Sequence, residues 1–114
     1  MRDDSARLQD ILNSINLIEV TLADGRLVYD LSEIEFQGIL RCLEIIGEAA
    51  KAISKELKDE NSNIPWRAIS DMRNVLAHQY FEVDHEKIEL VVHGSLEDLK
   101  STVIKILGGD SNCC

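Results

Sequence analysis

Proline occurs once in this chain, glycine six times, and aromatic residues make up only 4% of it. Proline interrupts helices and glycine weakens them, so the long stretches that lack both residues can be helical. No apolar run approaches the roughly 18 residues that a membrane-spanning helix requires. The polar start, Met1-Arg2-Asp3-Asp4, does not have the pattern of a signal peptide. We therefore expect a cytoplasmic protein with no membrane association.

Cysteine is also scarce, and the three cysteines show no Cys-x-x-Cys spacing. This excludes a disulfide framework and a zinc site of the usual spacing. Cys42 lies within an apolar helical pattern and is interpreted as a small buried hydrophobe. Cys113 and Cys114 end the chain in a segment, residues 108–114, that we expect to be a flexible tail.

Basic residues are outnumbered, with 12 Lys and Arg against 21 Asp and Glu and a formal net charge of −9. Binding to a polyanion usually relies on a basic patch that releases counterions. Here the cations are spread along the chain, which argues against non-specific binding to duplexes and against DNA as a partner. The negative charge is still compatible with action on RNA through a small local site, or with action on RNA under the control of a partner.

Apolar residues recur at spacings of three and four in two long segments, which predicts helices. The first segment is residues 5–20, and its apolar stripe contains Leu8, Ile11, Leu12, Ile15 and Ile18. The second is residues 33–57, with Phe36, Leu40, Leu43, Ile46, Ala50, Ile53 and Leu57. Ser32 followed by Glu35 matches a capping box at the start of this second helix.

Three shorter helices are predicted in the second half of the chain. Pro65 fits the first turn of a helix that continues through Trp66 and Leu76 and breaks near residues 78–81. A short helix after Asp84 and a last helix from Ser95 carry the remaining apolar residues: Ile88, Val91, Val92, Leu96, Leu99, Val103 and Leu107. The expected fold is all-α, an up-and-down bundle of four to five helices, in one domain over residues 1–114.

The third predicted helix holds the residues with the most chemical content. Arg67, Asp71, Asn74 and His78 fall within roughly 60° of one another on an ideal helix. This polar stripe can be a solvated face with a pair such as Arg67 and Asp71. Arg73 and His78, in contrast, are about 140° apart. They can serve one site only if the helix ends before His78 or if two subunits share the site.

Three stretches of the chain together resemble the HepT family of HEPN-domain proteins. They are Ile64-Pro65-Trp66-Arg67, the run from Met72 to Phe81, and the run from Leu43 to Ala50. The second contains the hallmark of the family, an arginine, four to six residues, a histidine, any residue and a tyrosine. The occurrence of these stretches together is specific to the family, and the similarity covers essentially the whole chain.

The resemblance implies a helical homodimer that is the toxin of a type VII-like toxin–antitoxin pair. Members of the family are regarded as metal-independent endoribonucleases whose motifs face one cleft from both subunits. By position, Arg73 and His78 match the catalytic pair and Asn74 matches the polar residue that follows the arginine. Tyr80 matches the tyrosine that an MntA-type nucleotidyltransferase antitoxin modifies with AMP. Asp71 departs from the small residue expected there, and either pairs with Arg67 or weakens RNA binding.

Two other functions are compatible with the same residues. The first is a non-catalytic helical subunit that binds substrate or nucleotide for a nucleotidyltransferase. The second is a purely structural dimerisation module in which the polar stripe is solvated surface. Taken singly, His78 can simply end a helix and Tyr80 can anchor it, and Trp66 is expected to pack in the core or an interface. His85 and His93 lack ligand partners at a useful spacing, so no metal or other cofactor is expected.

Overall fold

The computed structural model describes residues 3–79 and 85–108, with residues 73–79 described by their backbone alone. Its helices are α1 (Asp4–Thr21), α2 (Glu33–Ala52), α3 (Lys55–Glu60), α4 (Trp66–Gln79), α5 (His85–Leu90) and α6 (Leu96–Gly108). The 3-10 turns η1 (Ala23–Gly25) and η2 (Val28–Asp30) connect α1 to α2, and a π-helical segment η4 (Val91–Ser95) connects α5 to α6. No strand occurs in these two described ranges, so the predicted all-α class is confirmed.

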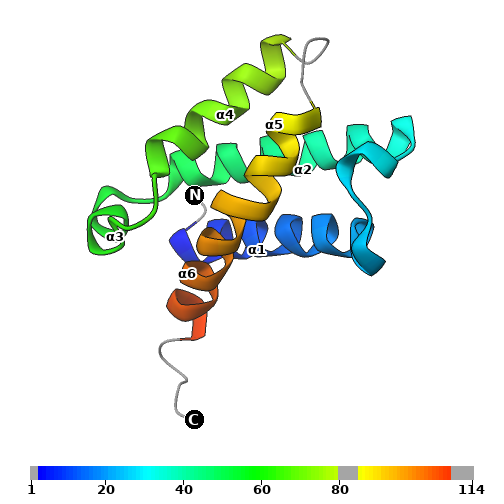
Figure 1. Ribbon diagram of the computed structural model, residues 1–114. Helices are drawn as coiled ribbons and strands as arrows, with labels where there is room; N and C mark the ends of the chain where they lie inside the picture. The colour runs from blue at the N-terminus through cyan, green and yellow to red at the C-terminus, as the bar shows by residue number, and fades with distance from the viewer. Residues whose placement is uncertain (1–2, 80–84, 109–114) are drawn as a thin grey trace.

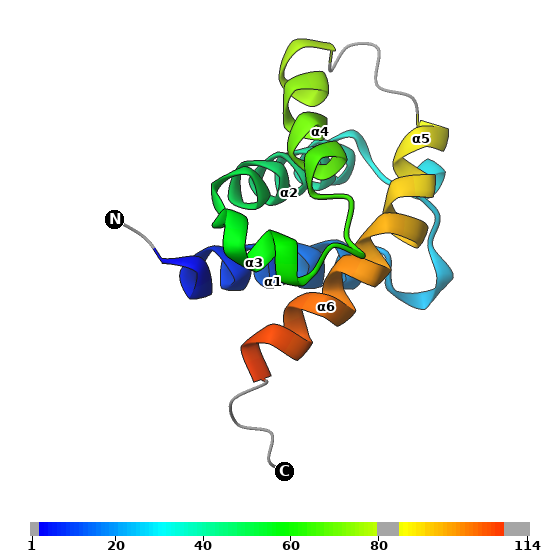
Figure 2. The same cartoon turned by 90° about the vertical axis from the view of Figure 1, so that its left-hand side faces the viewer.

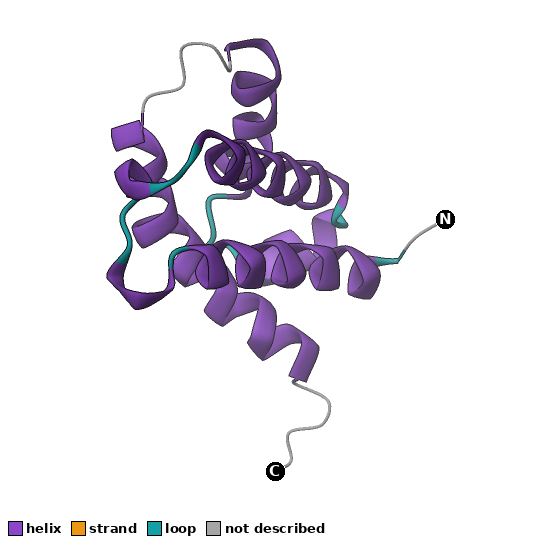
Figure 3. Cartoon of the chain, turned by 90° about the vertical axis from the view of Figure 1, so that its right-hand side faces the viewer, coloured by secondary structure: helices purple, strands orange, loops and turns teal. Residues whose placement is uncertain are grey.

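Helix α2 lies at the centre of the bundle. It packs against α1 on one side and α4 on the other, and α6 crosses α1 (Figure 1). The view from the side shows α4 resting on α2 (Figure 2). Helices connected by loops and turns account for the whole described fold (Figure 3). The helix that carries the sequence motif is therefore supported mainly by α2.

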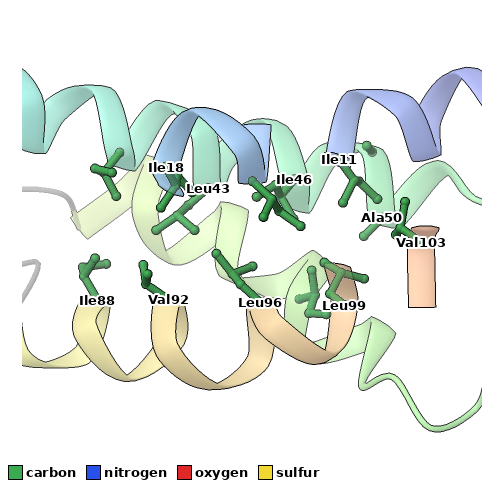
Figure 4. Packing of buried hydrophobic residues seen from close by; sticks show 14 of the residues in the cluster. Ile11, Ile18, Leu43, Ile46, Ala50, Ile88, Val92, Leu96, Leu99 and Val103 are labelled. Carbon is green, nitrogen blue, oxygen red and sulfur yellow. The ribbon is translucent and has the colours of Figure 1, made fainter. Parts of the chain in front are cut away.

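A single cluster of apolar side chains fills the space between these helices. The predicted stripes of α1 and α2 supply much of it, as Ile11, Leu43 and Ile46 are each 0% exposed (Figure 4). Leu12 and Leu57 lie at its margin and are only partly buried. Cys42 is also half-buried, and desolvation raises the pKa of its thiol. No helix in the described part of the chain is long and apolar enough to cross a membrane.

The prediction of one continuous helix over residues 33–57 is wrong. Helix α2 ends at Ala52, because Ile53 adopts an extended backbone and Ser54 caps the separate helix α3. The Ser54 backbone N–H and hydroxyl donate to the two carboxylate oxygens of Asp4, at 3.0 and 2.6 Å. These two hydrogen bonds join the start of α1 to the junction between α2 and α3.

The last helix α6 begins at Leu96, directly after Ser95, as predicted, but Ser95 does not cap it. The chain stays helical from α5 through η4 into α6, and the Leu96 N–H donates to the Val91 carbonyl in a π turn. This wider turn keeps Ile88, Val92 and Leu96 buried along one helical run. Ser95 is therefore an interior helical residue, and Asp84, the other predicted cap, lies outside the described residues.

The capping box at the start of α2 is confirmed, and it includes an additional ion pair. The Glu35 carboxylate accepts from the Ser32 N–H at 3.0 Å, and the Glu35 N–H donates to the Ser32 hydroxyl at 3.2 Å. Arg26 donates to both Glu35 oxygens, at 2.6 and 3.0 Å. The Arg26 guanidinium and the Ser32 N–H together lower the Glu35 pKa from 4.5 to about 2.

This ion pair predicts a specific dependence of stability on pH. A carboxylate with a lowered pKa stabilises the folded state above about pH 4.5 and loses that effect as the pH falls toward 2. We expect Glu35→Gln, which keeps the capping geometry, to unfold at lower urea concentration than the unaltered protein at pH 7. The difference should shrink as the pH is lowered through this window, and a difference independent of pH would contradict the prediction.

Candidate active site on helix α4

Helix α4 begins at Trp66, directly after Pro65. Trp66 is buried, and its indole N–H donates to the Asn61 carbonyl at 3.0 Å. The Ile69 N–H donates to the Pro65 carbonyl at 3.1 Å, which starts the helical hydrogen bonds. Trp66 is therefore a core residue, as the sequence predicts, and it fixes the start of the helix that carries the motif.

The burial of the first two turns shows which sides of α4 face the protein. Trp66 and Ile69 are buried against the core, and Met72 is half-buried beside them. A groove of about 160 Å³ lies beside this buried side of α4, between α4 and the η4–α6 segment. Its walls are formed by Pro65, Ala68, Ile69, Met72, Val91, Ser95 and Leu96. The remaining side of these first two turns faces solvent.

Arg67 and Asp71 occupy this solvent-facing side. The Arg67 Nε and Asp71 Oδ2 atoms are 4.0 Å apart, and the two side chains are 96% and 65% exposed. The predicted pair is thus present, but an exposed pair at this distance contributes little to stability. Asp71 offers its carboxylate to Arg67, which is one of the two roles predicted for it.

The backbone of α4 continues without a break through Gln79 and so includes Arg73, Asn74 and His78. The interpretation in which the helix ends before His78 is therefore wrong. On an ideal helix, Arg73 falls at nearly the same angle around the axis as Trp66, and His78 at nearly the same angle as Arg67. Asn74 falls about 40° from His78, one turn earlier. One subunit accordingly places Arg73 and His78 about 140° apart around the helix axis.

Tyr80, the predicted site of modification, lies outside the described residues. Its role stays a prediction, as do the catalytic roles of Arg73 and His78 and the supporting role of Asn74. Within the described ranges, no group of three His, Cys, Asp or Glu side chains is arranged to hold a metal ion.

Two histidines for which the sequence predicted no metal-ligand partners make other side-chain contacts in the structure. The His85 ring stacks on Phe36 and Tyr29, with centroid distances of 4.0 and 5.7 Å. The His93 Nε2 lies 3.1 Å from a carboxylate oxygen of Glu89. Sequence spacing gave no sign of the ring contacts, because they join η2, α2 and α5 through tertiary packing.

Comparison with known proteins gives a match over most of the chain. The family model described as "Ribonuclease HepT-like" matches residues 8–106. A Methanocaldococcus jannaschii protein named "Putative RNase" is 33% identical over 103 residues, which cover 90% of this chain and 94% of that protein. A Thermococcus cleftensis protein named "Probable ribonuclease HepT" is 36% identical over 100 residues, covering 87% and 91%.

A further relative is similar to this chain over about half of its own length. The Methanocaldococcus jannaschii protein named "Gamma-glutamylcyclotransferase and putative RNase" is 34% identical over 108 residues. The match covers 93% of this chain and 48% of that protein. No solved structure gives a significant match to the chain.

Proposed function

Because the chain belongs to the HepT-like ribonuclease family, as its motifs predicted, we propose a specific metal-independent endoribonuclease site for it. In this proposal Arg73 and His78 act together in a site that a homodimer completes. The supporting observation is the unbroken helix α4, which carries both residues on different sides of its axis. A second subunit related by twofold symmetry can supply the residue that one subunit lacks.

The proposed chemistry is transfer of the phosphodiester to the neighbouring 2′-hydroxyl. The 2′-oxygen attacks the phosphorus, the bond to the 5′-oxygen breaks, and the products are a 2′,3′-cyclic phosphate and a 5′-hydroxyl. Histidine has an unperturbed pKa of about 6.5, so His78 can accept or return a proton at neutral pH. Arg73 stabilises the charge that develops on the phosphoryl oxygens through its planar fork of donors. DNA lacks the attacking hydroxyl and is not cut.

The charge of the molecule agrees with a small local site. With a net charge of −9, extended contact with the RNA backbone is unfavourable, and binding depends on a few well-placed groups. The exposed stripe of α4 offers one such cation in Arg67, which is 96% exposed. We therefore expect weak binding to duplexes and cleavage in single-stranded segments.

Purified protein incubated with RNA in the presence of EDTA tests this function. We expect cleavage products that end in a 2′,3′-cyclic phosphate, and no cleavage of an oligonucleotide whose scissile nucleotide is 2′-deoxy. Cleavage of the 2′-deoxy substrate would contradict attack by the 2′-hydroxyl. RNA that stays intact under all conditions would favour the non-catalytic subunit of a nucleotidyltransferase.

We further propose that the protein is the toxin of a toxin–antitoxin pair and that a nucleotidyltransferase antitoxin transfers AMP to Tyr80. An AMP group places a bulky anion beside the cleft and would exclude RNA by occlusion and like-charge repulsion. This part of the proposal rests on the match of Tyr80 to the tyrosine of the family motif.

Incubation with the antitoxin and ATP should therefore add AMP to the protein and abolish cleavage. Tyr80→Phe should remain unmodified and active, because phenylalanine keeps the ring but lacks the accepting oxygen. Intact-mass spectrometry and an RNA cleavage assay on the same samples measure both effects. Modification of Tyr80→Phe, or full activity of the modified protein, would contradict the proposal.

A further inference from the structure

Three rings that are distant in the sequence form a stack at one end of the bundle. The His85 ring lies nearly parallel to that of Phe36, with an interplanar angle of 11° and a centroid distance of 4.0 Å. The Tyr29 ring is also nearly parallel to His85, at 17° and 5.7 Å. The stack thus joins η2, the start of α2 and the start of α5.

The stack extends from the core to the surface. Phe36 is 6% exposed, His85 is half-buried and Tyr29 is 62% exposed. Aromatic residues make up only 4% of the chain, and Tyr29 is the one exposed aromatic residue among those the structure describes. Its exposure on a stack of rings contrasts with Trp66, which is buried in the core.

The turn that carries Tyr29 is held on both sides of this residue. The Leu27 N–H donates to the Asp30 carboxylate at 2.8 Å, and the Val28 N–H donates to the Glu89 carboxylate at 2.6 Å. Val28 is itself 0% exposed. Because the backbone on either side of Tyr29 is fixed, a ligand that stacks on its ring would not have to order a flexible loop.

The start of α5, which carries His85, links the stack to the end of α4. Figures 1 and 2 show the start of α5 between the C-terminal end of α4 and the cyan segment that leads into α2. Gln79, the last residue of α4, and His85 are six residues apart, so their Cα atoms are at most about 20 Å apart. A few nucleotides of extended RNA can reach from the motif helix to the stack.

We propose that Tyr29, supported by His85 and Phe36, is a stacking platform for one nucleobase of a single-stranded RNA substrate. Bases of single-stranded RNA commonly stack on tyrosine, phenylalanine and histidine rings, with little preference for the identity of the base. The site rests on the proposed ribonuclease function, which supplies the RNA. It adds a position outside the arginine–histidine motif at which the substrate is held.

The charges around the platform define how it binds. Asp30, Glu33 and Glu86 are exposed on the segments that carry the three rings and outnumber the exposed Lys87 beside Glu86, so the platform is a poor site for a phosphate. Its contribution to binding therefore comes from contact between rings. We expect the part of the affinity that depends on Tyr29 to change little with salt concentration, unlike binding that releases counterions.

An oligonucleotide that cannot be cleaved tests the platform separately from catalysis. The probe is a fluorescent single strand of about eight nucleotides, fully 2′-O-methylated so that no 2′-hydroxyl can attack. We expect Tyr29→Ala to raise its Kd roughly tenfold and Tyr29→Phe to leave it nearly unchanged, because phenylalanine retains the stacking face. Ile34→Ala, at an 83% exposed position on α2, is the control and should bind like the unaltered protein.

A second set of probes replaces one base at a time with an abasic site. At one position the abasic probe should bind the unaltered protein roughly tenfold more weakly, and there Tyr29→Ala should cause no further loss. Equal binding by Tyr29→Ala and the unaltered protein would overturn the platform even if RNA is cleaved. A Tyr29→Ala defect that persists with every abasic probe, or one shared by Tyr29→Phe, would also overturn it. If binding depends on both Tyr29 and one base of the probe, the platform is supported even when the protein cleaves no RNA.

Discussion

Replacing His78 with alanine should slow RNA cleavage by about 100-fold to 10,000-fold, the usual contribution of a general acid or base. Arg73→Ala should cost about 100-fold to 1,000-fold, because a positioned cation for the transition-state charge is lost. Single-turnover cleavage rates measure both effects without interference from product release. The two residues act in one step, so the double variant should lose less than the product of the two separate losses.

Two variants serve as matched controls for this prediction. His93→Ala removes a histidine that pairs with Glu89 on the η4 side of the bundle. Arg41→Ala removes an arginine of α2 whose side chain is 65% exposed and lies 3.4 Å from Glu44. Both controls should cleave RNA at close to the unaltered rate. If His78→Ala cleaves as fast as these controls, the catalytic assignment is wrong.

Leu43→Ala should lower the free energy of unfolding by about 2–5 kcal/mol, the usual cost of removing a fully buried leucine side chain. Leu43 is 0% exposed on α2, the helix that packs against both α1 and α4. The cavity would therefore lie in the layer that supports the motif helix (Figure 4). Small domains have only about 5–15 kcal/mol of stability, so this is a large fraction of the total.

Urea unfolding followed by far-UV circular dichroism measures this loss. Ile34→Ala is the comparison, because Ile34 is on the same helix but 83% exposed. Surface substitutions of this kind usually change stability by less than about 0.5 kcal/mol. A Leu43→Ala variant as stable as Ile34→Ala would contradict the central place of α2 in the core.

Most of the fold could be predicted from the sequence because its signals are local. The apolar stripe of α1 and the Ser32–Glu35 capping box depend on residues within one or two turns, and both are found in the structure. The end of α2 at Ala52 could not be predicted in this way. It accompanies the hydrogen bonds of Ser54 to Asp4, which join parts of the chain 50 residues apart.

The sequence predicts the chemistry of the candidate site, but not how the site is assembled. The residue types at Arg73 and His78 indicated phosphodiester chemistry, and helical geometry showed that one straight helix separates them. The structure adds that the helix is in fact unbroken through Gln79. The ring stack of Tyr29, Phe36 and His85 left no pattern in the sequence, since it depends on how three elements pack.

The central claim is that two subunits complete each site, and mixing two inactive variants tests it directly. In a heterodimer of Arg73→Ala and His78→Ala subunits, a shared arrangement leaves one site with both residues and one site with neither. After statistical mixing of equal amounts, half of the dimers are heterodimers, and each has one complete site out of two. The mixture should therefore show about a quarter of the unaltered activity. If Arg73 and His78 of the same subunit formed each site, every site would lack one residue. A mixture as inactive as its components, with heterodimers shown by native mass spectrometry, would contradict the shared site.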